Sequence, residues 1–323
     1  MARILVTGTA GFIASRTAEL LLDAGNEVVG VDDLHPAGIE LKRYRLGCLQ
    51  ERDGFTFMEL DVSDPEAVRE RVPGGAFDGV INLAARAGVR ASVEDPWPYV
   101  DVNVTGTLNL LELCRERGIP KFVLSSTSSL YGKGAPVPFR EDQDTNHPIS
   151  PYAATKKAAE ALSYTWHALH GLDVTVLRYF TVYGPAGRPD MATLPFVQKI
   201  REGRPITVYG DGSMSRDFTY VDDIARGTIA ALRPLGYEVV NLGGDSPHTV
   251  RELVETIERH VGRAAEIVHE TAHAADVDRT MACIDRAREL LEWEPEITLD
   301  EGIRRTVAWY EAERDWARDI PTG

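Results

Sequence analysis

Tyr152 and Lys156 lie four residues apart in a segment whose composition favours a helix. Ser150 suits the N-cap position of that helix and Pro151 suits its first turn. Residues with this spacing share one face of a helix, so the phenol and the ammonium should lie side by side. A phenol has an ordinary pKa of about 10, and a neighbouring ammonium stabilises its ionised form. The pair predicts that Tyr152 is a general base tuned by Lys156; the alternative is two ordinary helix residues.

A run of hydroxyl residues follows the apolar, strand-like segment 122–124. The run consists of Ser125, Ser126, Thr127, Ser128 and Ser129. Doubly wound sheets bind their ligands at the carboxyl ends of strands, which is where this run stands. One of these hydroxyls can share the proton of a substrate hydroxyl with Tyr152. The alternative is a serine-rich loop without a chemical role.

A turn that contains Gly8 and Gly11 follows the first strand-like segment and opens a helical stretch. The two glycines let the backbone approach a pyrophosphate, and the helix N-terminus offers free N–H groups. Asp32 stands about 20 residues further on, where a carboxylate binds adenosine ribose hydroxyls and repels a 2′-phosphate. Ala14 replaces the usual third glycine and is an accepted substitute. This pattern predicts that the chain binds NAD rather than NADP. The cationic nicotinamide of NAD would also favour the phenolate form of Tyr152. The alternative is that the glycines form a plain turn without a cofactor.

Short apolar segments alternate with helical stretches through the first half of the chain. The apolar segments are residues 4–6, 28–31, 55–60, 80–83, 122–124 and 174–177. This alternation predicts an α/β fold with a doubly wound parallel (Rossmann) sheet, buried on both faces. Glycines and prolines between residues 184 and 189 break the pattern, which returns at residues 221–232 and 239–242. We therefore expect a cofactor domain at residues 1–180 and 220–243, and a smaller α/β domain at residues 181–219 and 244–323.

The composition narrows the class of protein. The 323 residues include 43% hydrophobic and 26% charged residues, which is typical of a globular chain of about two domains. The net charge of -15 disfavours nucleic acid as a partner, and the sequence has neither a polybasic membrane anchor nor an apolar run of membrane-spanning length. Three scattered cysteines fit no zinc pattern and indicate reduced thiols in the cytoplasm. The strand-like start disfavours a signal peptide, and we expect no metal.

The glycine turn, the hydroxyl run and the Tyr152–Lys156 pair, in this order, resemble the extended short-chain dehydrogenase/reductase family. Its members epimerise, dehydrate or decarboxylate nucleotide sugars. Residues 82–85 resemble the cofactor-lining motif of the fourth strand, and residues 216–223 resemble the diphosphate-binding arginine segment. The resemblance implies a tightly bound, recycled NAD and a homodimer formed through helices at 104–113 and 158–169. The implied NAD ligands are Gly8, Gly11, Phe12, Ile13, Asp32, Asp61, Val62, Leu83, Ala84, Ala85, Asn103, Ser125, Tyr152, Lys156 and Tyr179.

Three segments, residues 87–90, 178–185 and 187–192, are most similar to UDP-glucuronate 4-epimerases. The resemblance makes Thr127 the catalytic hydroxyl beside Tyr152 and Lys156. The second domain would bind the nucleotide sugar. The implied substrate ligands are Arg90, Thr127, Ser128, Ser129, Thr181, Arg188, Arg216 and Asp276. The four hydroxyl residues in this set would line the C6 carboxylate, the arginines at 188 and 216 would face the nucleotide, and Asp276 would hold the UDP ribose.

The residues after Thr127 distinguish the reactions within the family. A dehydratase needs an added acid and base there, and a decarboxylase usually has Glu in place of Ser129. UDP-glucose 4-epimerases usually have Asn in place of Thr181. The resemblance therefore implies interconversion of UDP-glucuronate and UDP-galacturonate through a 4-keto intermediate. UDP-glucose 4-epimerase, UDP-glucuronate decarboxylase and a non-catalytic, NAD-sensing scaffold remain alternatives.

Several further residues have two interpretations. Arg86 and Arg90 belong either to the cofactor–substrate cleft or to loop structure. Lys42 and Arg45 lie either near the adenosine end of the cofactor or on a solvated helix face. His167 and His170 share a helical face without a complete ligand set, which favours a plain surface helix. Cys283 and His273 depart from the residues usual in relatives and bear on the nucleotide pocket.

Overall fold

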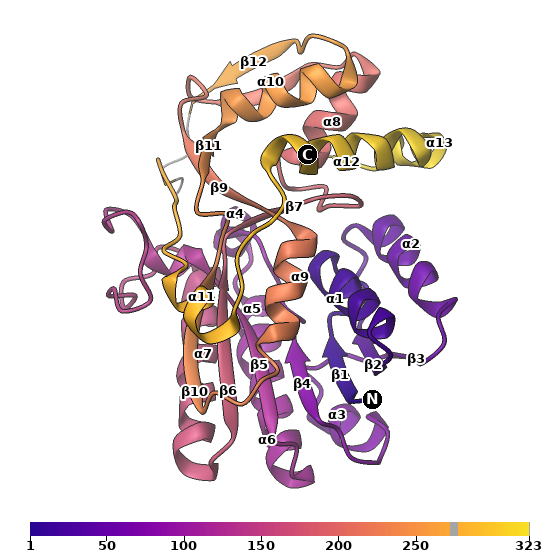
Figure 1. Ribbon diagram of the computed structural model, residues 1–323, viewed down its shortest axis with the longest axis vertical. Helices are drawn as coiled ribbons and strands as arrows, with labels where there is room; N and C mark the ends of the chain where they lie inside the picture. The colour runs from indigo at the N-terminus through magenta and orange to yellow at the C-terminus, as the bar shows by residue number, and fades with distance from the viewer. Residues whose placement is uncertain (272–276, 323) are drawn as a thin grey trace.

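A seven-stranded parallel sheet forms the centre of the larger part of the molecule (Figure 1). The computed structural model describes residues 1–271 and 277–322. The strand order is β10-β6-β5-β4-β1-β2-β3. The strands are β1 (Arg3–Thr7), β2 (Glu27–Asp32), β3 (Phe55–Glu59), β4 (Gly79–Asn82), β5 (Lys121–Thr127), β6 (Asp173–Tyr179) and β10 (Tyr237–Leu242). The predicted doubly wound parallel sheet is confirmed.

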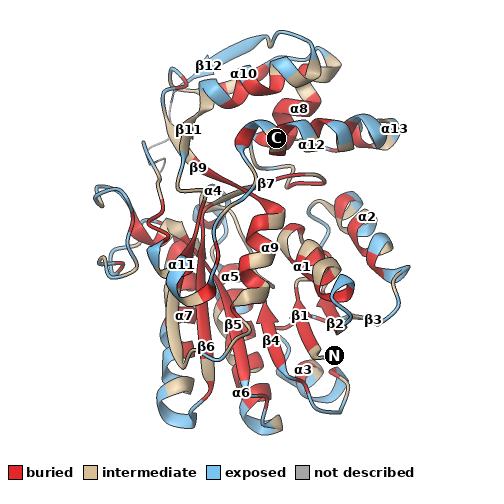
Figure 2. Ribbon diagram, in the orientation of Figure 1, coloured by how far each residue is buried: buried red, intermediate tan, exposed pale blue. Residues whose placement is uncertain are grey.

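Helices cover both faces of this sheet. Ile4 and Val6 of β1 pack in one core with α1 (Phe12–Asp23), α9 (Val221–Ala230) and α11 (Asp285–Leu291). Leu5, between them, packs in a second core with α3 (Pro65–Arg71), α6 (Thr107–Arg117) and α7 (Pro151–His170). Alternate residues of a strand point to opposite faces, which explains the unbroken apolar runs. Buried residues accordingly fill the inner strands (Figure 2). The edge strand β3 departs from the predicted burial on both faces and is half exposed.

The second, smaller part has its own sheets and its own core. Its strands are β7 (Thr181–Tyr183), β8 (Ile206–Tyr209), β9 (Ser215–Tyr220), β11 (Pro247–Thr249) and β12 (Ile267–Glu270). They pair in the order β11-β9-β7 and as β12-β8. Its helices are α8 (Thr193–Glu202), α10 (Val250–Val261), α12 (Leu299–Ala312) and α13 (Arg314–Ala317). Leu194, Ile257 and Ile303 from three of these helices meet in one buried cluster. Between β9 and β11 the chain returns to the large sheet through α9 and β10, which pairs with β6.

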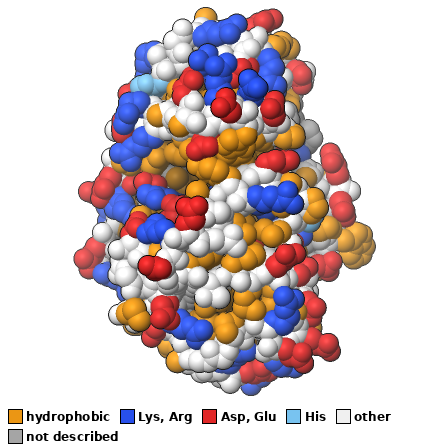
Figure 3. All heavy atoms as spheres, turned by 90° about the vertical axis from the view of Figure 1, so that its right-hand side faces the viewer, with side chains coloured by type: hydrophobic (Ala, Val, Ile, Leu, Met, Phe, Trp, Pro, Cys, Tyr) orange, Lys and Arg blue, Asp and Glu red, His pale blue; other side chains and the backbone are white. Residues whose placement is uncertain are grey.

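The surface combines charges of both signs. Acidic and basic side chains are interspersed with apolar ones on the face that carries α13 and α2 (Ile39–Gln50) (Figure 3). Short helical segments complete the chain. These are α4 (Val89–Glu94), α5 (Trp97–Tyr99), the π-helix η1 (Val100–Gly106) and the 3-10 helix η2 (Ser128–Tyr131). Among the helices that the structure describes, none has the length and apolar character that a membrane span requires.

Helix α7 begins where the sequence predicts. The hydroxyl of Ser150 accepts a hydrogen bond from the backbone N–H of Ala153 at 3.2 Å, and Pro151 occupies the first turn. The helix ends at Gly171, whose φ of 69° is left-handed. The cap therefore fixes the register of the helix, and with it the positions of Tyr152 and Lys156.

A buried ion pair ties α7 to the sheet. Glu160 of α7 accepts hydrogen bonds from Nε and Nη2 of Arg178, at 3.0 and 2.9 Å. Ser126 of β5 donates to the same carboxylate at 2.6 Å, and Nη1 of Arg178 donates to the hydroxyl of Tyr131 at 3.1 Å. Glu160 and Arg178 are 4% and 3% exposed, so each charge depends on the other for its solvation.

We expect single substitutions in this pair to be costly. Glu160→Leu or Arg178→Met leaves one buried charge without its partner, which should lower the free energy of unfolding by about 3–5 kcal/mol. The double variant should lose much less than the sum, because neither charge remains. Urea unfolding of the four proteins measures this coupling, and strictly additive losses would contradict it.

Candidate functional site

The glycine turn lies in close contact with the segment that follows β4. Gly8 has a φ of 70°, and a Cβ there would lie 2.8 Å from the backbone nitrogen of Ala84. The backbone N–H of Gly11 donates to the carbonyl of Gly8 at 2.7 Å. Gly11 is also the N-cap of α1, and no side chain in the described part of the chain caps this helix end. The first amides of α1 are therefore left for an anion, as a pyrophosphate cradle requires.

Asp32 is held at the end of β2 beside this turn. Its carboxylate accepts hydrogen bonds from the N–H of Ala10 at 3.1 Å and of Leu34 at 2.9 Å. Lys42 donates to it at 2.9 Å, which favours the interpretation of Lys42 as a residue near the adenosine end. Asp32 is 5% exposed and therefore fixed in position. The uncapped helix, the tight turn and this carboxylate together fit a dinucleotide.

Arg45 is buried, a placement that neither sequence interpretation anticipated. It donates to the carbonyls of Ala10 at 3.1 Å and of Ala186 at 3.0 Å, and so ties the glycine turn to the segment that follows β7. Burial, and then repulsion by Arg188, lower its pKa to about 9. The spacing of Leu41, Arg45 and Leu49 on one buried helix face was the available signal.

Asn103 connects three segments around the predicted cofactor site. It lies in η1, and its side chain exchanges hydrogen bonds with the backbone of Arg86, at 2.9 and 3.1 Å. It also donates to the hydroxyl of Thr155 in α7 at 3.0 Å. Through these hydrogen bonds Asn103 orders the residues after β4 and ties them to α7. The π-helical winding of η1 is of a kind often found at functional sites.

The other predicted cofactor residues are distributed around the same edge of the sheet. Asp61 and Val62 follow β3, and the carboxylate of Asp61 accepts hydrogen bonds from the backbone and hydroxyl of Ser63 at 2.8 and 2.7 Å. Phe12 and Ile13 open α1. The segment after β4, which lies against Gly8, contains Leu83, Ala84 and Ala85.

Lys156 is buried beneath the hydroxyl run. Its ammonium donates to the carbonyl of Ser125 at 2.8 Å and to the hydroxyl of Ser125 at 3.3 Å. Burial lowers the pKa of Lys156 to about 8, and the charge of Glu160 opposes this shift. The helical spacing brings Lys156 and Tyr152 to the same face of α7, as predicted.

Tyr152 lies between hydroxyls and a positive charge. Burial raises the pKa of Tyr152, whereas a hydrogen bond with Thr127 and the charge of Arg188 lower it. Thr127 donates to the hydroxyl of Ser129 at 3.1 Å and accepts the N–H of Ser129 at the same distance. The phenol and the hydroxyl run are therefore brought together. An ammonium or guanidinium side chain close to a phenol can stabilise its ionised form.

The members of the hydroxyl run differ in their surroundings. Ser128 and Ser129 are half-buried in η2, at the end of β5. Thr181 begins β7, where it pairs with Phe218 of β9, and is also half-buried. Ser126 instead donates to Glu160, so it belongs to the ion pair that holds α7.

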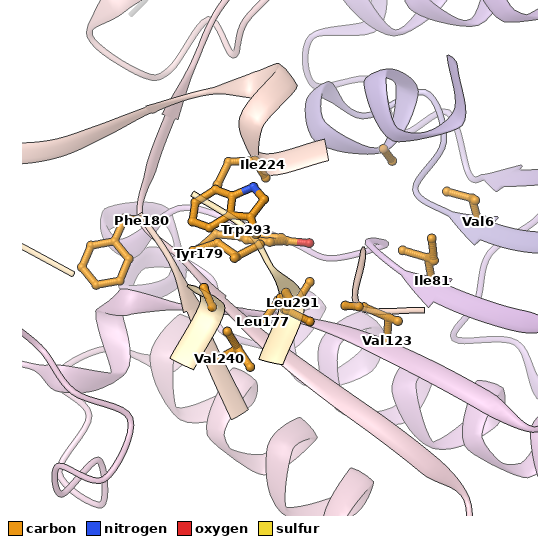
Figure 4. Close-up of a cluster of buried hydrophobic side chains, with 14 of the residues drawn as sticks. Val6, Ile81, Val123, Leu177, Tyr179, Phe180, Ile224, Val240, Leu291 and Trp293 are labelled. Carbon is orange, nitrogen blue, oxygen red and sulfur yellow. The ribbon is translucent and has the colours of Figure 1, made fainter. Parts of the chain in front are cut away.

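Two predicted ligands have partners within the protein. Arg188, which was expected to face the nucleotide, donates from Nε to Asp190 at 3.0 Å, and its charge also opposes the rise that burial causes in the pKa of Tyr152 and of Tyr99. Tyr179 was expected at the cofactor, but its hydroxyl lies 2.9 Å from that of Thr228. Figure 4 shows its side chain in the apolar core beneath Trp293. The ring of Tyr179 is large and apolar enough to complete this core. The family motif alone does not indicate this packing.

The remaining predicted substrate residues line the second part of the chain. Arg216 donates to the carbonyls of Ser215 at 3.0 Å and Asp278 at 3.4 Å. The guanidinium carbon of Arg90 lies 4.4 Å from the ring centroid of Tyr209 in β8, so α4 reaches the second part. Asp276 and His273 lie outside the described residues.

Asp217, next to Arg216, is a positioning residue that the sequence interpretation missed. Its carboxylate accepts the N–H of Ala282 at 2.7 Å and the N–H of Gly244, so it gathers two loops beside β9. Burial raises its pKa to about 6 despite these hydrogen bonds. The nearby Cys283 donates from its backbone to the carbonyl of Phe139 at 2.9 Å. Within residues 1–271 and 277–322, no cluster of three metal-ligating side chains occurs.

Comparison with known proteins agrees with this geometry. The sequence profile described as "NAD dependent epimerase/dehydratase family" matches residues 4–243. A UDP-glucuronate 4-epimerase from Thermodesulfobacterium geofontis is 53% identical over 311 residues, 96% of each chain. The crystal structure of a UDP-glucuronic acid 4-epimerase from Bacillus cereus, in complex with UDP-glucuronic acid and NAD, is similar with a TM-score of 0.89. It is 35% identical, and the match covers 96% of this chain and 99% of that one.

A UDP-glucose 4-epimerase from Thermotoga maritima, solved with UDP-glucose, is also similar. Its TM-score is 0.88 and its identity 33%, over 97% of this chain and 99% of that one. The family profile spans the glycine turn, the hydroxyl run and the Tyr152–Lys156 pair, which the structure brings to one edge of the parallel sheet. On its sequence, its fold and this arrangement, the chain belongs to the NAD dependent epimerase/dehydratase family.

Proposed function

We propose that the protein interconverts UDP-glucuronate and UDP-galacturonate by oxidation at C4, rotation of the 4-keto sugar and return of hydride to its opposite face. The observation that carries this proposal is that Tyr152 and Lys156 share a face of α7 next to a run of hydroxyls at Thr127, Ser128 and Ser129, with Tyr152 hydrogen-bonded to Thr127. The Thermodesulfobacterium relative bears the name of this activity, and the Bacillus structure contains both UDP-glucuronic acid and NAD.

The chain's own groups perform the proton transfers. NAD, when bound, accepts the C4 hydride and gives it back, so it is recycled. Tyr152 takes the proton of the C4 hydroxyl, directly or through the hydroxyl of Thr127, and returns it in the reverse step. With a pKa of about 8, Lys156 is mostly protonated at neutral pH, and its charge favours the phenolate. Arg188 acts in the same sense.

The hydroxyl residues can suppress a side reaction, the decarboxylation of the intermediate. The intermediate carries a ketone at C4 and a carboxylate at C6, which makes it a β-keto acid that can lose carbon dioxide. We propose that Thr127, Ser128, Ser129 and Thr181 hold the carboxylate by hydrogen bonds and keep it solvated. Neutral donors can do this without the acid or base that a dehydratase places here.

We further propose that residues 1–180 and 220–243 bind NAD, and that residues 181–219 and 244–323 bind the sugar nucleotide with Arg216 and Asp276. We propose a cytoplasmic homodimer that pairs the helices at 104–113 and 158–169. Exposed apolar side chains near these helices support the pairing: Trp97 is 74% and Leu169 71% exposed. Cys48, Cys114 and Cys283 are free thiols, in keeping with a reducing compartment.

The experiment that tests the activity is an incubation of the purified protein with UDP-glucuronate and NAD. Anion-exchange chromatography and proton NMR would resolve the products, while absorbance follows any NADH. We expect UDP-galacturonate without lasting NADH. UDP-pentose with accumulating NADH would indicate a decarboxylase, and conversion of UDP-glucose alone would indicate a UDP-glucose 4-epimerase. NAD binding without any turnover would favour a scaffold.

Replacing Lys156 should change the pH dependence of epimerisation. Lys156→Met removes the charge that lowers the pKa of Tyr152, so that pKa rises and less phenolate exists at a given pH. We expect kcat to fall roughly a hundredfold or more and the acidic limb of the kcat/KM profile to move to higher pH. Arg69→Met is the control, because it also removes one positive charge but breaks only an exposed ion pair with Glu116. An unmoved acidic limb would contradict the tuning role.

Removing the carboxylate donors should divert the reaction. Thr127→Val, Ser128→Ala and Thr181→Val each delete one hydroxyl, so the β-keto acid should decarboxylate more often. The measured quantity is the share of UDP-pentose among the products. Thr306→Val is a matched control, because that hydroxyl donates to the carbonyl of Gly302 in its own helix, α12. Loss of epimerisation without any pentose would show that the donors do not protect the carboxylate.

A further inference from the structure

Arg86 is anchored at its backbone beside the glycine turn. Its N–H donates to the amide oxygen of Asn103 at 2.9 Å, and its carbonyl accepts from the same amide at 3.1 Å. Ala84, two residues earlier, lies so close to Gly8 that a Cβ on the glycine would be 2.9 Å from its Cα. The base of the Arg86 side chain is therefore fixed at the end of β4, in contact with the turn that follows β1.

The guanidinium of Arg86 reaches across to the next strand but one. Its Nη2 donates to the carboxylate of Asp33 at 2.7 Å, and Asp33 directly follows β2. In the sheet, β1 lies between β4 and β2. The ion pair therefore spans the carboxyl end of β1, where the glycine turn and the open N-terminus of α1 lie. A dinucleotide places its pyrophosphate at this point of such a sheet.

One donor of the bridging side chain lacks an acceptor in the part of the chain that the structure describes. Nε of Arg86 is buried and has no hydrogen-bond partner among residues 1–271 and 277–322. A buried donor without an acceptor is unfavourable, and a guanidinium donor suits a phosphate oxygen. The side chain as a whole is 22% exposed, so it is held in the site rather than extended into solvent.

Asp33 is suited to hold the other end of this bridge. Burial alone would raise its pKa, but the N–H of His35 and the charges of Arg86 and Lys42 outweigh burial and lower it. Asp33 therefore remains ionised at neutral pH. Lys42 also contacts Asp32, so the bridge is joined to the carboxylate predicted to bind the adenosine ribose.

We propose that Arg86 and Asp33 form a clasp across the bound dinucleotide, with Nε of Arg86 donating to a phosphate oxygen, and that this clasp slows the release of NAD. The inference rests on the proposed function, in which each catalytic cycle returns the hydride and no exchange of cofactor is needed. Slow release then costs nothing in turnover and keeps the protein in its loaded form.

The test is the rate at which bound NAD exchanges, measured without any sugar nucleotide. Purified protein is loaded with radiolabelled NAD, desalted and mixed with excess unlabelled NAD, and the retained label is counted over time. Arg86→Met keeps the length of the side chain but removes both contacts, so exchange should become roughly tenfold faster or more. Asp33→Asn weakens the ion pairs with Arg86 and Lys42 but leaves Nε of Arg86 in place, and should give a smaller increase. The double variant should exchange no faster than Arg86→Met.

Arg69→Met is the matched control, because it breaks an exposed ion pair with Glu116 at 3.0 Å, far from the turn, and changes the charge equally. Its exchange rate should equal that of the wild type. An Arg86→Met rate within about twofold of the wild type would overturn the clasp. Thermal unfolding of each variant shows whether a changed exchange rate reflects a loss of fold. Asp33→Asn provides a second test, because asparagine has nearly the same shape as aspartate.

The outcomes distinguish the clasp from the proposed function. A wild-type protein that holds NAD and epimerises UDP-glucuronate, with exchange unaltered by Arg86→Met, would disprove the clasp alone. A protein that binds NAD without epimerising and shows the faster exchange would keep the clasp and overturn the proposed activity. A wild-type protein that binds no NAD would overturn both.

Discussion

The buried contact between Glu160 and Arg178 fixes the relation of α7 to the sheet, and the catalytic arrangement depends on that relation. Glu160 lies one turn beyond Lys156, and its carboxylate also binds Ser126 of the hydroxyl run. A single anion thus connects the helix of the predicted base with the two strands that end at the site. The same carboxylate is a counter-charge for Lys156, whose ammonium is otherwise desolvated. The carboxylate of Glu160 therefore both positions the helix that carries Tyr152 and Lys156 and balances the charge of Lys156.

The site combines a positive charge near Tyr152 with neutral hydroxyls after Thr127. The charge of Arg188, which also pairs with Asp190, opposes the rise that burial causes in the pKa of Tyr152. Ser128 and Ser129 stand where a dehydrating enzyme needs carboxyl groups. Positive charge helps remove a proton from the C4 hydroxyl, and neutral hydroxyls bind a carboxylate without protonating or deprotonating it. This division explains how a site can oxidise C4 and leave C5 and C6 unchanged.

Short patterns in the sequence predicted most of the strands and helices of the large sheet. The strands follow from buried apolar runs, and the start of α7 follows from Ser150 and Pro151, because such features act over a few residues. The arginines were different: Arg45 is buried, and Arg86 bonds to Asp33, which lies 53 residues away in the sequence. A long side chain reaches its partner through tertiary structure, so its sequence position limits its destination only weakly. For a related reason, the family motif did not indicate that the ring of Tyr179 packs in the core.

The two parts of the molecule answer opposing demands of the proposed reaction. The 4-keto sugar must rotate within the site, whereas the cofactor must stay in place between the two hydride transfers. Ligands at the ends of β1, β2 and β4 are fixed by one continuous parallel sheet, and the Arg86–Asp33 clasp belongs to this rigid set. Thr181 and Arg216 lie instead on the small sheet of the second part. The proposed sugar ligands therefore come from both sheets, because Thr127, Ser128 and Ser129 follow the end of β5, whereas the proposed clasp on the cofactor belongs to the large sheet alone.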